Sequence, residues 1–74
     1  MKKYEFQNYL THRRADVLTN VSGSDGYWFV LFYDKGELDP NVKGTGSDRA
    51  PGEKRFTSEA SAIRSAKHYV TKGA

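Results

Sequence analysis

Aromatic and basic side chains are the residues whose types and spacing suggest chemistry in this chain of 74 residues. Five Tyr, four Phe and one Trp accompany twelve Lys and Arg, which outnumber nine Asp and Glu and give a formal net charge of +3. Aromatic rings stack on nucleic-acid bases, and basic groups neutralise phosphates. The composition therefore predicts a nucleic-acid-binding module. Its contact candidates are Arg13, Arg14, Tyr27, Trp28, Tyr33, Lys54, Arg55, Arg64 and Lys67.

Residues that catalysis or metal binding would need are sparse. The chain has no Cys, which excludes disulfides, thiolate nucleophiles and cysteine-based zinc sites. His12 and His68 are the two imidazoles and lack the spacing of metal ligands, and no Gly-x-Ser-x-Gly nucleophile turn occurs. The glycines of residues 44–49 lack the lysine of a phosphate-binding P-loop. We therefore predict a protein that is not an enzyme and that uses no metal or cofactor.

The element that the sequence predicts most clearly is a helix from about Glu59 to Thr71. Thr57 and Ser58 offer hydroxyl caps before the acidic Glu59, which is the order expected at a helix start. Gly73 is placed to end the helix. Apolar residues recur at helical spacing and predict one face packed on a sheet. They are Ala60, Ile63, Ala66 and Val70, with Ala62 and Tyr69 widening the stripe.

Residues 27–33 predict a strand that is dense in aromatic and branched side chains. A turn cluster at residues 22–26 precedes it, and residues 15–21 alternate as its hairpin partner. Neither face of the 27–33 strand is polar, so each face needs a cover. That cover is a helix on each face, a second copy of the chain in a homodimer, or a bound partner.

The remaining segments complete an α+β fold class in a single small domain, residues 1–74. A short third strand at 54–56 leads into the helix, after a mobile loop of about 37–53 that is rich in Gly and Pro. At the amino terminus, Phe6, Tyr9, Leu10, Arg13 and Val17 form a helical stripe, although Tyr4-Glu5-Phe6 also alternates like a strand. The prediction is a three-stranded antiparallel sheet with the carboxyl-terminal helix packed on one face and a short amino-terminal helix.

The pattern of apolar residues predicts a cytoplasmic protein that does not enter a membrane. The longest apolar run covers residues 27–33, whereas a membrane-spanning helix needs about 20 apolar residues. Met1-Lys2-Lys3 is followed by no apolar region of a signal peptide.

Two segments resemble the plan of plant ethylene-response-type and phage-integrase amino-terminal DNA-binding domains. They are Asp25-Gly26-Tyr27-Trp28-Phe29-Val30, and Lys54-Arg55-Phe56-Thr57-Ser58-Glu59-Ala60 with the helix that follows. In those families a three-stranded sheet carries a Gly-x-Trp strand, leads into a Phe-Thr-x-x-Glu-Ala helix start, and enters the major groove. The resemblance implies Trp28, Lys54 and Arg55 as DNA contacts. In size and composition the chain also resembles small phage proteins that act against host systems, including anti-CRISPR and polymerase-inhibiting proteins.

Two functions follow from these patterns. In the first, the module binds nucleic acid, DNA in preference to RNA, and Lys54 and Arg55 share a sheet face with the rings of the 27–33 strand. The alternative for that face is that its rings pack under the amino-terminal segment and that Lys54 and Arg55 are solvated edge charges. In the second, the chain is a phage-type inhibitor that binds a host protein or nucleoprotein complex. Its ring-bearing face then docks in the partner, and the 37–53 loop becomes ordered there.

Overall fold

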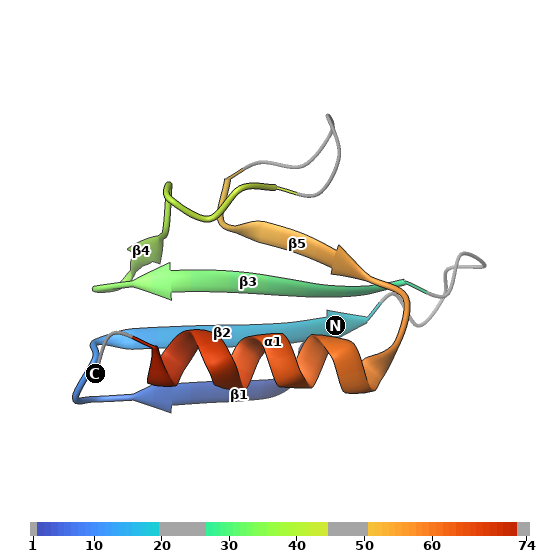
Figure 1. The fold of residues 1–74 in the computed structure, drawn as a ribbon, viewed down its shortest axis with the longest axis horizontal. Coiled ribbons are helices and arrows are strands. Elements are labelled where there is room, and N and C mark those ends of the chain that lie inside the picture. The colour runs from blue at the N-terminus through green and yellow to red at the C-terminus, as the bar shows by residue number, and fades with distance from the viewer. Residues whose placement is uncertain (1, 20–26, 45–50, 73–74) are drawn as a thin grey trace.

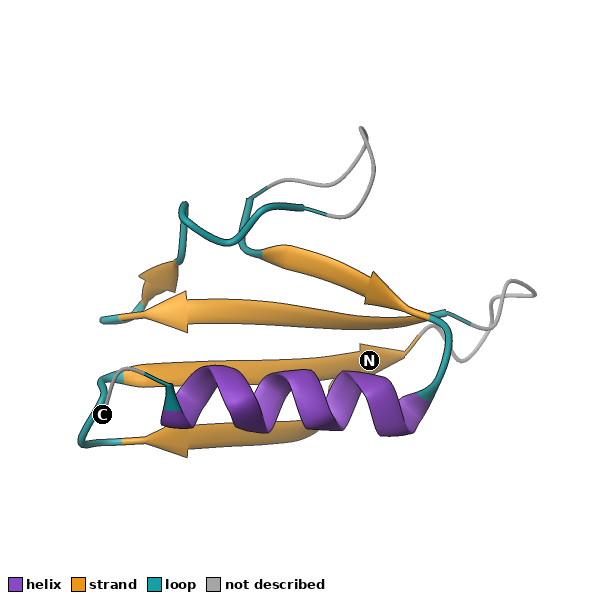
Figure 2. Ribbon diagram, in the orientation of Figure 1, coloured by secondary structure: helices purple, strands orange, loops and turns teal. Residues whose placement is uncertain are grey.

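Antiparallel strands followed by a helix make up the structure, a computed structural model that describes residues 2–19, 27–44 and 51–72 (Figure 1). Strand β3 pairs with β2 along one edge and with β4 and β5 along the other, while β1 extends the sheet beyond β2 (Figure 2). The elements are β1 (Lys2–Asn8), β2 (Arg13–Thr19), β3 (Trp28–Asp34), β4 (Glu37–Leu38), β5 (Glu53–Phe56) and α1 (Glu59–Thr71).

The α+β class and the carboxyl-terminal helix are confirmed, but the predicted amino-terminal helix is wrong. Residues 2–8 form β1, which pairs with β2 so that Phe6 lies opposite Ala15. The helical stripe depended on Tyr9 and Leu10, which are 78% and 88% exposed in the turn after β1. Pairing with β1 satisfies the backbone groups along the outer edge of β2. The sheet therefore has more strands than the three that the sequence predicted.

The predicted hairpin and third strand are confirmed. Strands β2 and β3 pair antiparallel, with Val17 opposite Val30, and β2 begins two residues earlier than expected. Residues 20–26, which include the predicted turn, lie outside the described residues. Strand β5 pairs antiparallel with β3 and leads into α1.

Helix α1 has the bounds that its capping residues and periodicity predicted. The Ser58 hydroxyl oxygen accepts a hydrogen bond from the Ser61 N–H at 3.2 Å, which satisfies one amide of the first turn. The backbone N–H of Lys72 closes the other end on the His68 carbonyl, whereas Gly73 lies outside the described residues. Ala60 is exposed, not part of the packed face. The buried helix residues are Ala62, Ala66, Tyr69 and Val70.

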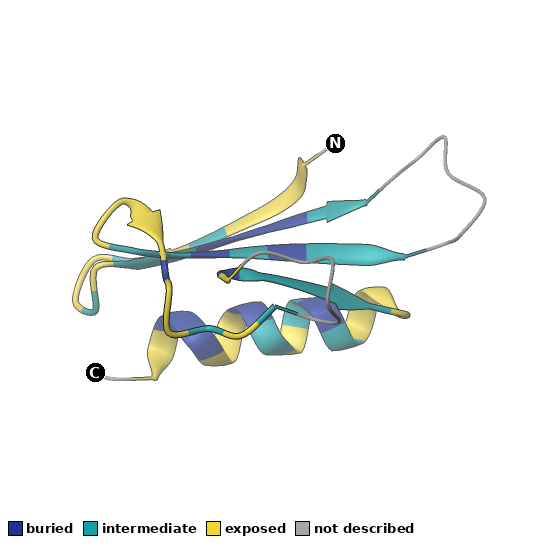
Figure 3. Cartoon of the chain, turned by 90° about the horizontal axis from the view of Figure 1, so that it is seen from above, coloured by how far each residue is buried: buried dark blue, intermediate teal, exposed yellow. Residues whose placement is uncertain are grey.

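The hydrophobic core lies between α1 and one face of the sheet (Figure 3). The sheet contributes two cross-strand pairs to it, Ala15 with Phe32 and Val17 with Val30. Small Ala62 and Ala66 side chains let the helix approach these strands closely. The ring of Phe32 meets that of Tyr69 edge to face, with centroids 4.9 Å apart.

Hydrogen bonds fix both ends of the 37–53 segment to β3. The Phe32 N–H donates to the Gly52 carbonyl at 2.8 Å, and the Asp39 N–H donates to the Phe32 carbonyl at 2.9 Å. Gly52 has φ of +89°, and a Cβ there would lie 3.2 Å from the Asp39 carbonyl oxygen. Only glycine fits this close crossing without strain. The segment that the sequence treats as one loop thus contains β4 and a tight return into β5.

Asp39 and Tyr69 form a buried polar pair that ties the residues after β4 to α1. The Tyr69 hydroxyl donates to Asp39 Oδ2 at 2.7 Å, and the Asn41 N–H donates to Oδ1 at 2.9 Å. Burial alone raises the pKa of the Asp39 carboxyl, but these hydrogen bonds and the charge of Arg13 outweigh burial and hold the pKa below its usual value. Burial and the bond to Asp39 raise the pKa of Tyr69 well above its usual value.

We expect Asp39 to make the fold sensitive to acid. Its pKa is lower in the folded chain than in the unfolded chain, where it is about 3.9. The stabilisation is therefore complete above the unfolded-state pKa and is lost as the pH falls through the folded-state pKa. Asp39→Asn should lower the free energy of unfolding at neutral pH by about 1 to 3 kcal/mol and flatten its decline in acid.

Urea unfolding from neutral pH to about pH 2 measures this effect. Glu37→Gln, which removes an exposed carboxylate two residues away, is the control and should keep the wild-type curve. Parallel curves for Asp39→Asn and wild type would contradict the role given to Asp39.

Candidate nucleic-acid interface

One face of the sheet carries no described element, because α1 lies along the other face only (Figure 3). Side chains alternate along each strand, so the neighbours of the core residues point to this uncovered face. The register places Leu18 opposite Phe29, and Phe29 opposite Arg55. We call this surface the open face. It consists of Glu5, Gln7, Arg14, Asp16, Leu18, Tyr27, Phe29, Leu31, Tyr33, Glu53 and Arg55.

Two arginines lie on two tyrosine rings of the open face. The guanidinium carbon of Arg14 is 4.1 Å from the ring centroid of Tyr33, and that of Arg55 is 4.4 Å from the centroid of Tyr27. Tyr27 and Tyr33 stand at opposite ends of β3, with half-buried Phe29 and Leu31 between them. Aromatic and apolar side chains therefore run along this side of β3, with an arginine over the ring at each end.

Charges of both signs surround the rings. Asp16 is 6% exposed although it lies on the open face, and its Oδ1 is 3.3 Å from Arg14 Nε while its Oδ2 is 3.9 Å from Lys2 Nζ. The Arg14 contact is an ion pair without hydrogen-bond geometry, and neither atom has a hydrogen-bond partner among the described residues. Lys2 also bonds Glu5 at 2.7 Å, which raises the pKa of Lys2 and lowers that of Glu5.

The structure divides the contact candidates of the sequence between two faces. Arg14, Tyr27, Tyr33 and Arg55 come together on the open face. The expectation that Lys54 and Arg55 share the ring-bearing face is wrong, because adjacent residues of a strand point to opposite sides. Lys54 lies opposite the core residue Val30, and Trp28 packs against the core beside Phe56.

The other candidates lie on or beside the helix. Arg13 Nη1 donates to the carbonyls of Tyr69 at 3.4 Å and Lys72 at 3.0 Å, so it caps the carboxyl end of α1. Lys67 Nζ is 5.6 Å from the ring centroid of Phe6, and Arg64 is exposed on α1. Arg64 and Lys67 are separated from the open face by the thickness of the sheet.

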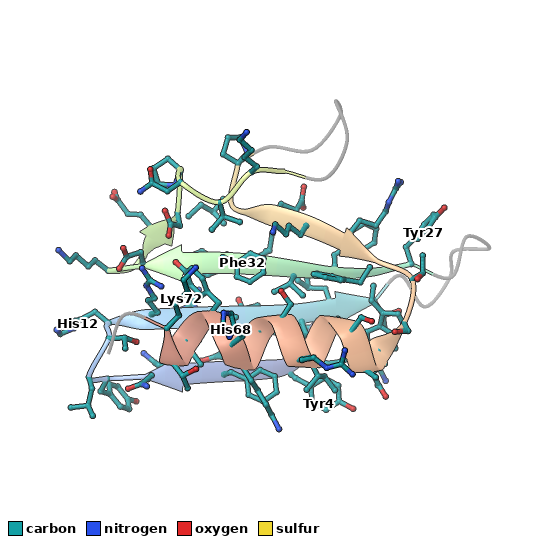
Figure 4. The ribbon with its side chains drawn as sticks, viewed as in Figure 1. Tyr4, His12, Tyr27, Phe32, His68 and Lys72 are labelled. Atoms are coloured by element: carbon teal, nitrogen blue, oxygen red, sulfur yellow. The ribbon has the colours of Figure 1, made fainter. Side chains whose placement is uncertain are left out.

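A hollow of about 370 Å³ opens on the helix side of the sheet. Phe32, Tyr69 and Val42 line it together with basic residues from three segments, namely Lys43, Lys54, His68 and Lys72. Figure 4 shows Phe32 in the middle of the sheet, with His68 of α1 and Lys72, the residue after α1, near it. The two basic residues of β5 thus lie on different surfaces, Lys54 at this hollow and Arg55 on the open face.

Comparison with protein-family models, with curated proteins and with solved structures finds no match to this chain. The case for a site therefore depends on the chemistry of its own residues. In the described part of the chain, no group of three or more His, Cys, Asp or Glu side chains is placed to hold a metal ion. No helix there has the length and apolar character to cross a membrane.

Sequence reasoning missed several residues of the open face. Leu18 and Asp16 belong to it because β2 pairs in register with β3, which places them opposite Phe29 and Leu31. Adjacent residues of a strand point to opposite faces, so Lys54 and Arg55 lie on different faces. Lys54 takes the core side because it pairs with buried Val30. The burial of Asp16 had no signal in the sequence, since it depends on its neighbours Lys2 and Arg14.

Removal of Arg14 and removal of Asp16 should change the free energy of unfolding by different amounts. Arg14→Gln leaves a buried carboxylate with one distant cation and should lower the free energy of unfolding by about 1 to 3 kcal/mol. Asp16→Asn removes the buried charge itself and should change it by less than about 1 kcal/mol. Urea unfolding of both variants and the double variant measures the asymmetry, and the double variant should recover most of the loss. Equal losses for the two single variants would contradict this account.

Proposed function

We propose that the protein is a non-enzymatic nucleic-acid-binding module that holds single strands on the open face. The observation that supports this proposal best is the pair of Arg–Tyr stacks at the two ends of β3. A guanidinium placed over a ring keeps N–H groups for a phosphate, and its outer side can stack on a base. Each stack therefore offers both interactions that a nucleotide needs.

The dimensions of the open face suit a short single strand. Tyr27 directly precedes β3, and Tyr33 follows it by six residues along extended chain, which corresponds to about 20 Å. Sheets that bind RNA through aromatic side chains stack two or three bases over such a surface. Phe29 and Leu31 lie between the two stacks and provide apolar contact for the bases in the middle.

The width of the sheet favours single strands over a duplex. Neighbouring strands lie about 4.8 Å apart. The outer strands of the row β1, β2, β3 and β5 are therefore about 14 Å apart. The major groove of B-DNA is about 12 Å wide and admits a two-stranded ribbon or a helix. An unstacked strand, in contrast, can lie across the whole face.

Acidic residues on the open face limit how strongly binding depends on salt. Arg14, Arg55 and Lys2 face the acids Glu5, Asp16 and Glu53 on the same surface. Neutralisation of about three phosphates gives a slope of about −2 for the logarithm of affinity against the logarithm of salt concentration. Stacking of bases against the two Arg–Tyr pairs and Phe29 supplies the rest of the affinity.

Arg55 and Lys54 form a matched pair that tests which face binds. They are adjacent and carry the same charge, but Arg55 stacks on Tyr27 while Lys54 lines the helix-side hollow. Arg55→Gln should weaken binding to a labelled single-stranded oligonucleotide by about 1 to 3 kcal/mol, and Lys54→Gln should have a much smaller effect. Fluorescence anisotropy over a salt series, with duplex DNA and RNA measured in parallel, gives these affinities. The reverse order of the two variants would place binding on the helix side and contradict the proposal.

Tyr33 and Tyr4 provide a second pair, in which aromatic rings are compared. Tyr33 lies under Arg14 on the open face, whereas the Tyr4 hydroxyl bonds Glu59 of α1 on the other side of the sheet. We expect Tyr33→Leu to weaken binding by about 1 to 3 kcal/mol and Tyr4→Leu to leave it unchanged. The same anisotropy titration measures both, and equal effects would show that no specific ring is stacked.

A second candidate function has one observation in its favour. Tyr9 and Leu10 expose large apolar side chains at the tip of the β1–β2 hairpin, which is a feature of surfaces that dock on proteins. An inhibitor-type protein would use this tip against its partner. In that case nucleic-acid binding is absent even at low salt, and Tyr9→Ser with Leu10→Ser removes binding to the partner while the fold is kept.

A further inference from the structure

A second hollow, of about 390 Å³, lies where the turn after β1 meets the turn after β3. Figure 4 shows His12 at this end of the sheet and Tyr27 at the opposite end. Tyr33 and Arg14, which form one of the stacks of the open face, also line the hollow, so the two surfaces are continuous. The complete lining is Gln7, Asn8, Tyr9, His12, Arg13, Arg14, Tyr33, Lys35 and Gly36.

The lining carries four basic residues, and no described acidic residue belongs to it. Arg13 is held by the carbonyls at the end of α1, and Arg14 lies between Tyr33 and Asp16, so these two form the wall. His12 and Lys35 are exposed at the mouth, one from each turn. The hollow is therefore suited to an anion, and its volume is at the lower end of the range for small-molecule sites.

Both of these mouth residues have a backbone conformation that glycine adopts more easily. His12 has φ of 60° and Lys35 has φ of 55°, and the Lys35 N–H donates to the His12 carbonyl at 2.8 Å. This hydrogen bond joins the two turns and fixes the two residues next to each other. Glycine would adopt this positive φ with less strain at each position, as Gly36 does. Two basic side chains thus stand at positions of backbone strain, which is a feature of ligand sites.

We propose that this hollow binds a terminal phosphate monoester. The inference rests on the proposed function, because a strand that lies along β3 ends at the hollow after passing Tyr33 and Arg14. A terminal monoester carries nearly two negative charges at neutral pH, whereas each internal phosphodiester carries one. Lys35 and two arginines, in a lining that contains no described acidic residue, favour the more highly charged group. The chemistry is shared by the phosphorylated end of a nucleic acid and by a free nucleotide or inorganic phosphate.

Three oligonucleotides of the same sequence test the proposal, one with a 5′-phosphate, one with a 3′-phosphate and one with neither. We expect one phosphorylated form to bind about 10-fold more tightly than the unphosphorylated form. Lys35→Gly and His12→Gly should each reduce this preference to less than about 2-fold, while their thermal midpoints stay at or above that of wild type because the strain is relieved. Lys35→Arg keeps the cation and should keep the preference. Arg64→Gln removes one charge from the exposed face of α1 and should also leave the preference unchanged.

The outcomes separate this inference from the proposed function. Equal affinity for the three oligonucleotides would overturn the phosphate site and leave the proposed function standing. A chain that binds no oligonucleotide, but whose His12 and Lys35 amide resonances shift with inorganic phosphate or pyrophosphate, would overturn the proposed function and assign the hollow to a free phosphate compound. Absence of both responses would overturn both.

Discussion

The structure depends on one constraint: β3 is apolar on both faces, and α1 can cover only one of them. Val30 and Phe32 take the covered side and build the core with Ala15, Val17 and the small residues of the helix. Phe29, Leu31 and the two tyrosines remain on the other side, where no described element lies. Burial of apolar area is the main source of stability in a domain of this size, so packing α1 on one face of β3 leaves the other face without a cover among the described elements.

The same alternation distributes the charged residues. Arg13 and Arg14 are neighbours, yet one completes the end of α1 and the other lies on an exposed tyrosine. Lys54 and Arg55 divide in the same way between the helix-side hollow and the open face. The chain thus places the two Arg–Tyr pairs on the open face and places further basic side chains around the two hollows.

Local signals predicted the elements whose interactions are local. The Ser58 cap and the apolar period predicted α1, and the aromatic run predicted β3. The amino terminus was mispredicted because Tyr9 and Leu10 have helical spacing in the sequence, whereas pairing with the edge of β2 decided the conformation. The hollow between the two turns could not be predicted, since it forms only when the hydrogen bond from Lys35 to His12 brings distant segments together.

The most direct test of the open face is a methyl NMR titration of the intact chain with a short single-stranded oligonucleotide. Leu18 and Leu31 lie on the open face, while Val17 and Val30, their immediate neighbours in sequence, are buried under α1. The account predicts that the methyl resonances of the two leucines shift strongly, together with the ring resonances of Tyr27 and Tyr33, and that those of the two valines shift little. Shifts confined to the valines and to α1, or no shifts at low salt, would contradict it.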